Sequence, residues 1–172
     1  MITIRRFKSI DQQAVKGLVV GIMNAEFSDA KAAYPTQDID EIQKTYGGLG
    51  EAFFVAQDGE HKIIGTVAIK KEDERVALLR RLFVAPTHRN QQLGIKLIDH
   101  ALEFCYEVGY NEIIFKTTSQ MRRAIDVCQK RGFIPRAKVQ LGSIELCKYS
   151  LSLRNGVKNN SSSSSKKSSS KI

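Results

Sequence analysis

The stretch RRLFVAPTHRNQQLGIKLIDHALEFCYEV, residues 80–108, decides how we expect this chain to fold. It begins with an apolar run at 82–84, turns at a proline, and passes through a basic and amide-rich loop at 88–92. Beyond Gly94 it becomes a long amphipathic helical pattern. A strand, polar loop and helix in this order direct free backbone N–H groups towards an anion. The alternative is an ordinary connecting loop with a solvated Arg89.

The overall composition fits one globular domain. The chain has 172 residues, 42% of them hydrophobic, which is enough for a substantial core. No apolar run approaches the roughly 20 residues of a membrane span, and charges interrupt residues 1–13, where a secretory signal would be apolar. We therefore expect a cytoplasmic protein that does not bind a membrane. Cysteines 105, 128 and 147 have no metal-type spacing, so we expect neither a metal site nor disulfides.

The positive charge is concentrated at the C-terminal end. The net charge is +9, but five of the 27 basic residues follow Leu153, where Asp and Glu are absent. The 22 remaining basic residues exceed the 18 acidic ones by four, which suits an anionic small ligand and disfavours a nucleic-acid partner. Residues 154–172 are rich in Ser, Lys and Asn and are predicted to be a disordered tail. The predicted folded domain is therefore 1–153.

The rest of the chain supplies strands and helices around the opening stretch. Strands are predicted at 2–6, 52–57, 63–69, 76–84, 111–116, 133–139 and 143–153, and helices after Ser9 to about Phe27, at 38–46, at 91–108 and at 120–131. Strand 76–84, helix 91–108 and strand 111–116 form a crossover unit. The two strands should therefore be parallel neighbours.

Three local signals make sharper predictions. Ser9 and Gln12 have the spacing of a capping box, so the first helix should begin at Ser9. Asp58-Gly59 predicts a two-residue hairpin turn. Val108 shares a helical face with the apolar residues of helix 91–108 and should be buried.

Two motifs and the order of elements resemble one family. The string 82–95, Leu-Phe-Val-Ala-Pro-Thr-His-Arg-Asn-Gln-Gln-Leu-Gly-Ile, is similar to the acetyl-CoA motif of the GNAT N-acetyltransferase superfamily, R/Q-x-x-G-x-G/A after a strand and a proline. The segment from Ala124 to Gly132-Phe133 is similar to its A-x-x-x-Y-x-x-x-G-F segment. The resemblance implies an α/β (α+β) fold. Its mixed, mostly antiparallel sheet would have about seven strands, a splayed parallel pair (76–84 and 111–116) and about four helices.

The resemblance also implies a reaction. It is direct transfer of an acetyl group from acetyl-CoA to a primary amine of a small molecule, peptide or protein. The pantetheine arm would lie between the splayed strands and pair with the backbone of Leu82, Phe83 and Val84. The pyrophosphate would be held by Arg89, Asn90, Gln91, Gln92, Leu93, Gly94 and Ile95. No metal is implied, and a homodimer is common in the superfamily.

This chain departs from the superfamily's pattern at four positions. Gln92 replaces the first glycine of the motif, and Met121 replaces an asparagine that often touches the cofactor. Leu78 replaces a glutamate of the fourth strand. Cys128 replaces the tyrosine that would protonate the departing thiolate; it is either the catalytic acid or inert packing. These departures motivate an alternative function, a catalytically weak CoA-binding or regulatory protein.

The amine acceptor is not determined by these motifs. Residues 24–50 and 139–145 would shape its site, and Lys116, Thr117 and Thr118 either line it or cap the next helix. An acidic group in the first of these regions suits a cationic amine, although Asp38 and Asp40 could equally start a helix. Its members are Glu26, Asp29, Asp38, Asp40 and Glu41. The candidate general bases are Glu26, Glu41 and Glu51, each of which could instead be a solvated surface charge.

Overall fold

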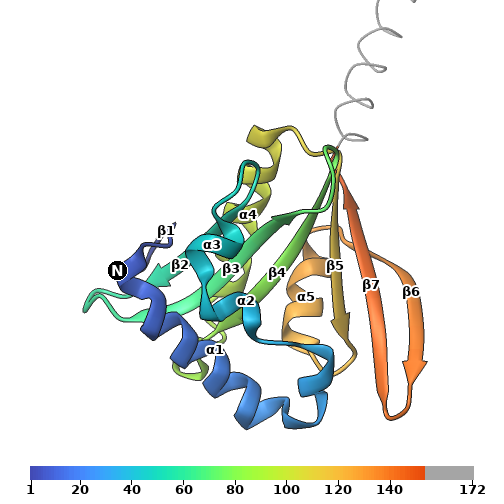
Figure 1. Ribbon diagram of the computed structural model, residues 1–172, viewed down its shortest axis with the longest axis horizontal. Coiled ribbons are helices and arrows are strands. Elements are labelled where there is room, and N and C mark those ends of the chain that lie inside the picture. Colours follow the sequence, from blue (N-terminus) through green and yellow to red (C-terminus); the bar gives the residue numbers. More distant parts are fainter. Residues whose placement is uncertain (154–172) are drawn as a thin grey trace, which may run out of the picture.

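Seven strands form one mixed sheet in the order β1-β2-β3-β4-β5-β7-β6 (Figure 1). The structure, a computed structural model, describes residues 1–153; the predicted tail lies outside these residues. The strands are β1 (Thr3–Arg6), β2 (Ala52–Gln57), β3 (Ile63–Lys71), β4 (Val76–Val84), β5 (Glu112–Thr118), β6 (Ile134–Leu141) and β7 (Ile144–Ser152). Within the described residues β4 and β5 are the one parallel pair. The predicted fold class is confirmed.

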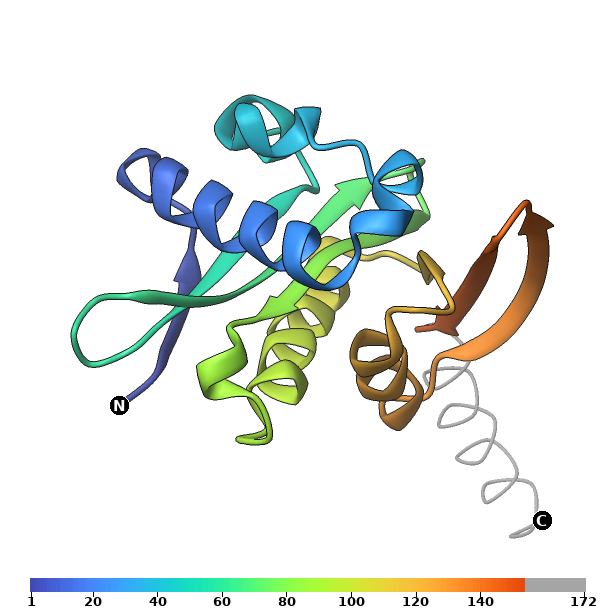
Figure 2. The ribbon, with the colours of Figure 1, turned by 90° about the horizontal axis from the view of Figure 1, so that it is seen from below.

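Helices cover both faces of the sheet (Figure 2). They are α1 (Gln12–Glu26), α2 (Gln37–Asp40), α3 (Ile42–Tyr46), α4 (Leu93–Val108) and α5 (Arg122–Lys130). The predicted helix 38–46 is broken into α2 and α3 at Glu41, whose backbone angles (φ −138°, ψ 68°) are not helical. Helix α1 packs on β3 from one side, and α4 packs on β3 and β4 from the other. The central strands are therefore buried on both faces, as their uninterrupted apolar sequences require.

The parallel pair separates halfway along its length. Pairing runs from Val76–Glu112 to Leu79–Phe115 and ends there, although both strands continue. A β-bulge lies just beyond this point, because Ala68 pairs with Arg80 and Thr66 with Phe83. Arg81 within the bulge has a φ of 54°, and its carbonyl accepts a hydrogen bond of 2.7 Å from the Thr66 hydroxyl. The bulge turns β4 away from β5, which leaves the gap that the resemblance predicts.

The three local predictions are wrong, each for a physical reason. A 3-10 turn, η1 (Ser9–Asp11), precedes α1, and the Asp11 carboxylate, not the Ser9 hydroxyl, accepts the Lys8 N–H at 2.8 Å. The β2–β3 loop spans five residues, because the Asp58 carboxylate accepts two backbone N–H groups and so stabilises a wider turn. Val108 is 43% exposed, since it is the last residue of α4 and no further helical turn follows it.

The last two strands form the sheet's edge. All eight residues of β6 are exposed, including the apolar Ile134, Val139 and Leu141. Figure 1 shows the β6–β7 ribbon beside β5, away from the helices of the α1 face. The homodimer expected from the resemblance stays a prediction.

Candidate active site

A cavity of about 690 Å³ lies between the end of β4, the start of α4 and α5. Nine of the ten predicted cofactor residues line it: Leu82, Phe83, Val84, Arg89, Asn90, Gln92, Leu93, Gly94 and Ile95. The tenth, Gln91, is exposed and does not line it. Further lining comes from basic side chains of α5 and from His88, so the cavity combines an apolar floor with a positively charged rim. We call it the first cavity.

The start of α4 carries free backbone donors. Gln92, the residue before the helix, has a φ of 60°, and Asn90 has a φ of 67°. No side chain within residues 1–153 caps this helix end, so its first-turn N–H groups are available to an anion beside the first cavity. The left-handed backbone at Gln92 explains why the motif has glycine there, since a side chain is strained in that conformation.

Replacing Gln92 with glycine is expected to relieve this strain. We predict that Gln92→Gly raises the free energy of unfolding by up to about 1 kcal/mol, offset in part by the greater freedom of glycine in the unfolded chain. Gln91→Gly is the matched control, because Gln91 lacks a positive φ and its substitution should destabilise. Urea unfolding of both variants measures the difference, and equal effects would contradict this explanation.

Gly94 has a second reason to be glycine. A Cβ at this position would lie 3.1 Å from Cγ2 of Val127 on α5. The residue therefore lets α4 and α5 approach each other closely, in addition to exposing backbone to a ligand as its sequence context predicts. Both helices thereby contribute walls to one cavity.

Glu26 ties three elements together at the rim of the first cavity. Its carboxylate accepts two hydrogen bonds from the Arg89 guanidinium, at 2.8 and 2.7 Å, and lies 3.3 Å from Arg123 of α5. Hydrogen bonding from Arg89 holds the pKa of Glu26 below its usual range. Arg89 also donates to the Val84 carbonyl at 3.2 Å. The positive charge of Arg89, which we predicted to bind the pyrophosphate, is therefore shared with Glu26. Glu26 is an ion-pair partner in this structure and not a free base.

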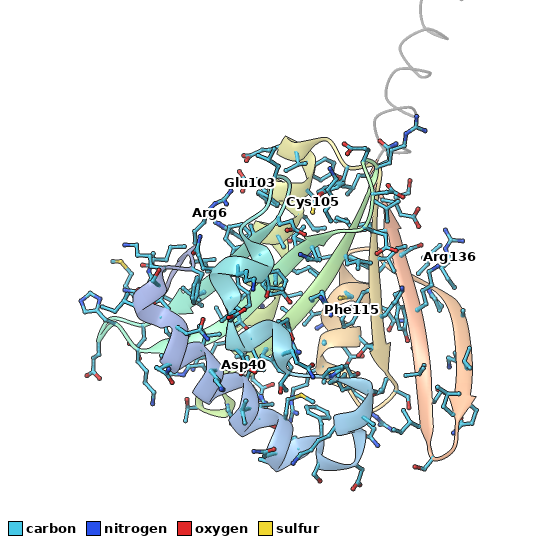
Figure 3. All side chains as sticks on the ribbon, viewed as in Figure 1. Arg6, Asp40, Glu103, Cys105, Phe115 and Arg136 are labelled. Carbon is cyan, nitrogen blue, oxygen red and sulfur yellow. The ribbon has the colours of Figure 1, made fainter. Side chains whose placement is uncertain are left out.

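A second cavity, of about 300 Å³, lies at the splay between β4 and β5. It shares Leu82, Phe83, Met121 and Ala124 with the first, so the two cavities meet at these side chains. Phe115, labelled in Figure 3, lines it from β5. The two cavities are therefore neighbours at the place where β4 and β5 part.

Tyr34 closes the second cavity from the N-terminal half of the chain. Its hydroxyl is 2.9 Å from the Thr117 hydroxyl and accepts the Thr118 N–H at 2.6 Å. The sequence indicated only a break at Tyr34-Pro35. The contact spans 83 residues and leaves no local pattern, so sequence reasoning missed it. Lys116 and Thr117 line the cavity as proposed from their position, whereas Thr118 neither lines it nor caps α5 with its side chain.

A buried ion pair supports the bulge of β4. The Arg81 guanidinium donates to both oxygens of Asp38, at 2.9 and 2.5 Å, and to the Pro35 carbonyl at 2.6 Å. The Tyr46 hydroxyl donates to the same carboxylate at 2.6 Å. Burial would raise the pKa of Asp38, but these hydrogen bonds hold it below its usual range. Burial beside this carboxylate raises the pKa of Tyr46.

The remaining carboxylates named from the sequence lie away from the second cavity. Glu51 accepts the Lys71 N–H at 3.0 Å and pairs with Lys70 at 2.9 Å, and Glu41 pairs with Lys44. No Asp or Glu within residues 1–153 lines the second cavity. None of the three candidate general bases is therefore placed to take a proton from a ligand bound in it.

Cys128 does not join the other predicted site residues. It is fully buried on α5 and lines neither cavity. Burial raises the pKa of its thiol, as expected for a sulfur in an apolar core. This position favours the packing role over the role of catalytic acid.

We expect Cys128→Ala to keep its turnover within about twofold of the parent and to lose roughly 1 kcal/mol of stability through the small cavity it leaves. Release of free CoA measures turnover, and urea unfolding measures stability. A drop of about 100-fold in kcat with an unchanged KM would restore Cys128 as the acid.

Residues 1–153 contain neither a membrane-spanning helix nor a cluster of metal-binding side chains. No helix there is both long and apolar enough to cross a membrane. No group of three or more His, Cys, Asp or Glu side chains there could hold a metal ion.

Comparison with known proteins identifies the family. The model of the acetyltransferase (GNAT) family matches residues 19–133. The chain belongs to this family, and its fold is that of a solved acetyltransferase of the GNAT family.

Its relatives include N-acetyltransferases of vertebrates. Human N-acetyltransferase 8 is 33% identical over 102 residues, 56% of this chain and 44% of the relative. The Xenopus tropicalis protein camello is 27% identical over 113 residues, 63% of this chain and 51% of the relative. The chain thus matches about half the length of these curated relatives. Among solved structures, yncA of Salmonella typhimurium with acetyl-CoA has a TM-score of 0.68 at 18% identity, covering 88% of this chain and 94% of that one.

Proposed function

We propose that this protein transfers an acetyl group from acetyl-CoA to a primary amine by direct attack of the amine on the thioester. The observation that carries the proposal is the meeting of the two cavities at Leu82, Phe83, Met121 and Ala124. The first cavity offers backbone N–H groups for an anion and an apolar floor, and the second offers a neighbouring space for the acceptor. Two substrates held on opposite sides of this junction would react without a covalent enzyme intermediate.

The residues of the first cavity fit acetyl-CoA. Beyond Leu79 the edge of β4 that faces β5 is unpaired, so the backbone at 82–84 can pair with the amides of a pantetheine arm. The N–H groups at the start of α4 suit a pyrophosphate. Arg122, Arg123 and Lys130 add positive charge at the rim. When bound, acetyl-CoA would supply the activated acyl group, and these residues would orient it and stabilise its phosphates.

The second cavity would hold the amine near the junction. Its apolar walls would favour the neutral, nucleophilic form of the amine over the ammonium. Since no carboxylate of residues 1–153 lines it, the proton would pass to water at the open side of the cavity. The alternative, a catalytically weak CoA-binding or regulatory protein, is favoured by Gln92 and by the absence of a glutamate at Leu78.

Two measurements separate these functions. Acetyl-CoA at 100 times its dissociation constant should stabilise the folded protein by about 2.7 kcal/mol, seen as a rise in melting temperature. No stabilisation at millimolar acetyl-CoA would exclude both functions. Release of free CoA with a panel of amines then decides between them. Turnover with any amine supports the enzyme, and binding without turnover supports the regulatory protein.

A further inference from the structure

We propose that the amine acceptor carries a carboxylate, as an amino acid with an apolar side chain does, and that Arg80 and Lys116 bind this carboxylate. The inference rests on the proposed function, because it names the substrate of the same site. It is drawn from the charges and the apolar surface that line the second cavity.

Two unpaired positive charges flank the second cavity from its two strands. Leu78 and Ile114 are paired residues of β4 and β5. Because strand side chains alternate, Arg80 and Lys116, two residues further along, lie on the same face as that pair. Both line the cavity, and neither has a salt-bridge partner within residues 1–153.

The third basic residue of the cavity is already neutralised. Arg81 is bound to Asp38 on both oxygens, with side-chain exposures of only 6% and 9%. The cavity therefore carries a net positive charge from Arg80 and Lys116. A cationic acceptor would be repelled by it, and an anionic group would be attracted.

Most of the acidic residues that the sequence suggested for binding a cationic amine are paired with basic residues of this chain instead. Asp38 pairs with Arg81 and Glu26 with Arg89. Glu41 pairs with Lys44, and Asp40, labelled in Figure 3, pairs with Lys16 of α1 at 2.8 Å. Of the five acids only Asp29 has no pair within residues 1–153, and it does not line either cavity. The prediction of a cationic amine therefore loses its support.

The rest of the lining of the second cavity indicates the chemistry of the part of the acceptor that lies beyond its carboxylate. Beyond Tyr34 and Thr117, the other walls are aliphatic or aromatic, among them Leu78, Ile114 and Phe115. An uncharged, apolar side chain on the acceptor fits these walls. A volume of about 300 Å³ suits a single amino acid. A carboxylate at one end and an apolar side chain at the other describe that molecule.

The test compares amines that differ only in the negative charge. Alanine, methionine and phenylalanine are assayed with acetyl-CoA beside their amides and beside spermidine, with release of free CoA as the readout. We expect kcat/KM for at least one amino acid to exceed that of its amide by about tenfold, the effect of one charge-assisted contact. Arg80→Gln and Lys116→Gln should each remove most of this preference. Lys62→Gln, at an exposed loop position, should leave it unchanged.

Binding of the products tests the inference separately from turnover. Calorimetric titration compares N-acetyl amino acids with their amides on the parent and on the two variants. A preference of about tenfold for the carboxylates that the variants lose supports the inference, even if no amine is turned over and the proposed function fails. Equal or better turnover of amides or spermidine, or equal binding of both products, would overturn it and leave an acetyltransferase of another specificity.

Discussion

Arg81→Met is expected to lower the free energy of unfolding by about 3–5 kcal/mol, because it leaves the carboxylate of Asp38 buried without its cation. The side chains of Arg81 and Asp38 are 6% and 9% exposed, so water cannot replace the lost hydrogen bonds. The variant also removes the donor to the Pro35 carbonyl, which holds the segment before α2 against the bulge. Urea unfolding at neutral pH measures the loss.

The pH dependence of the loss identifies its cause. In the parent the pKa of Asp38 is held below its usual value of 3.8, so the ion pair contributes stability at neutral pH that is lost as the pH falls through the folded pKa. In Arg81→Met burial dominates and raises the pKa of Asp38, so the variant gains stability on acidification. The difference between the two proteins should therefore be smaller at pH about 5 than at neutral pH.

A double variant provides the control. Arg81→Met with Asp38→Asn removes both charges, keeps an acceptor for the Tyr46 hydroxyl, and should recover most of the lost stability. A double variant as unstable as Arg81→Met alone would show that the loss comes from packing of the bulge and not from the buried charge. We expect the single and the double variant to keep the strand order of the sheet, since β4 is paired to β3 on both sides of the bulge.

The fold was predictable because its signals are local. The amphipathic pattern of α4 and the apolar runs of β2 and β3 each depend on residues within one element, and the βα crossover requires β4 and β5 to be parallel. The cofactor residues also form one continuous segment, so the structure gathers nine of ten into one cavity. Gln91 is the exception: Asn90, Gln91 and Gln92 are all exposed, but Gln91 alone of the three does not line the cavity.

The second cavity was not predictable because its parts are far apart in sequence. Tyr34 meets Thr117 across 83 residues, and Arg81 meets Asp38 across 43. Charges such as Asp38 and Glu26 look solvated in the sequence, and only packing shows that each has a cationic partner. Cys128 shows the converse. The superfamily's pattern suggests it as a site residue, yet it is buried on the inner face of α5.

The junction of the two cavities offers the most direct test of the proposed reaction. Ala124 is 9% exposed on α5 and lines both cavities, so a larger side chain at this position would lie between them. Phenylalanine at this position would project into the junction and separate the two substrates. Because the cavities are open, the larger ring should cost no more than about 1–3 kcal/mol of stability.

We expect Ala124→Phe to lower kcat/KM by about 100-fold or more, since displacement of the reacting groups by an ångström has an effect of that size. Release of free CoA measures turnover, and circular dichroism with urea unfolding confirms that the variant folds. Ala14→Phe, an equal enlargement at an exposed position of α1, should keep parent activity. Parent-like turnover in a folded Ala124→Phe variant would show that the substrates meet elsewhere, and the joined cavities would then no longer support acetyl transfer between them.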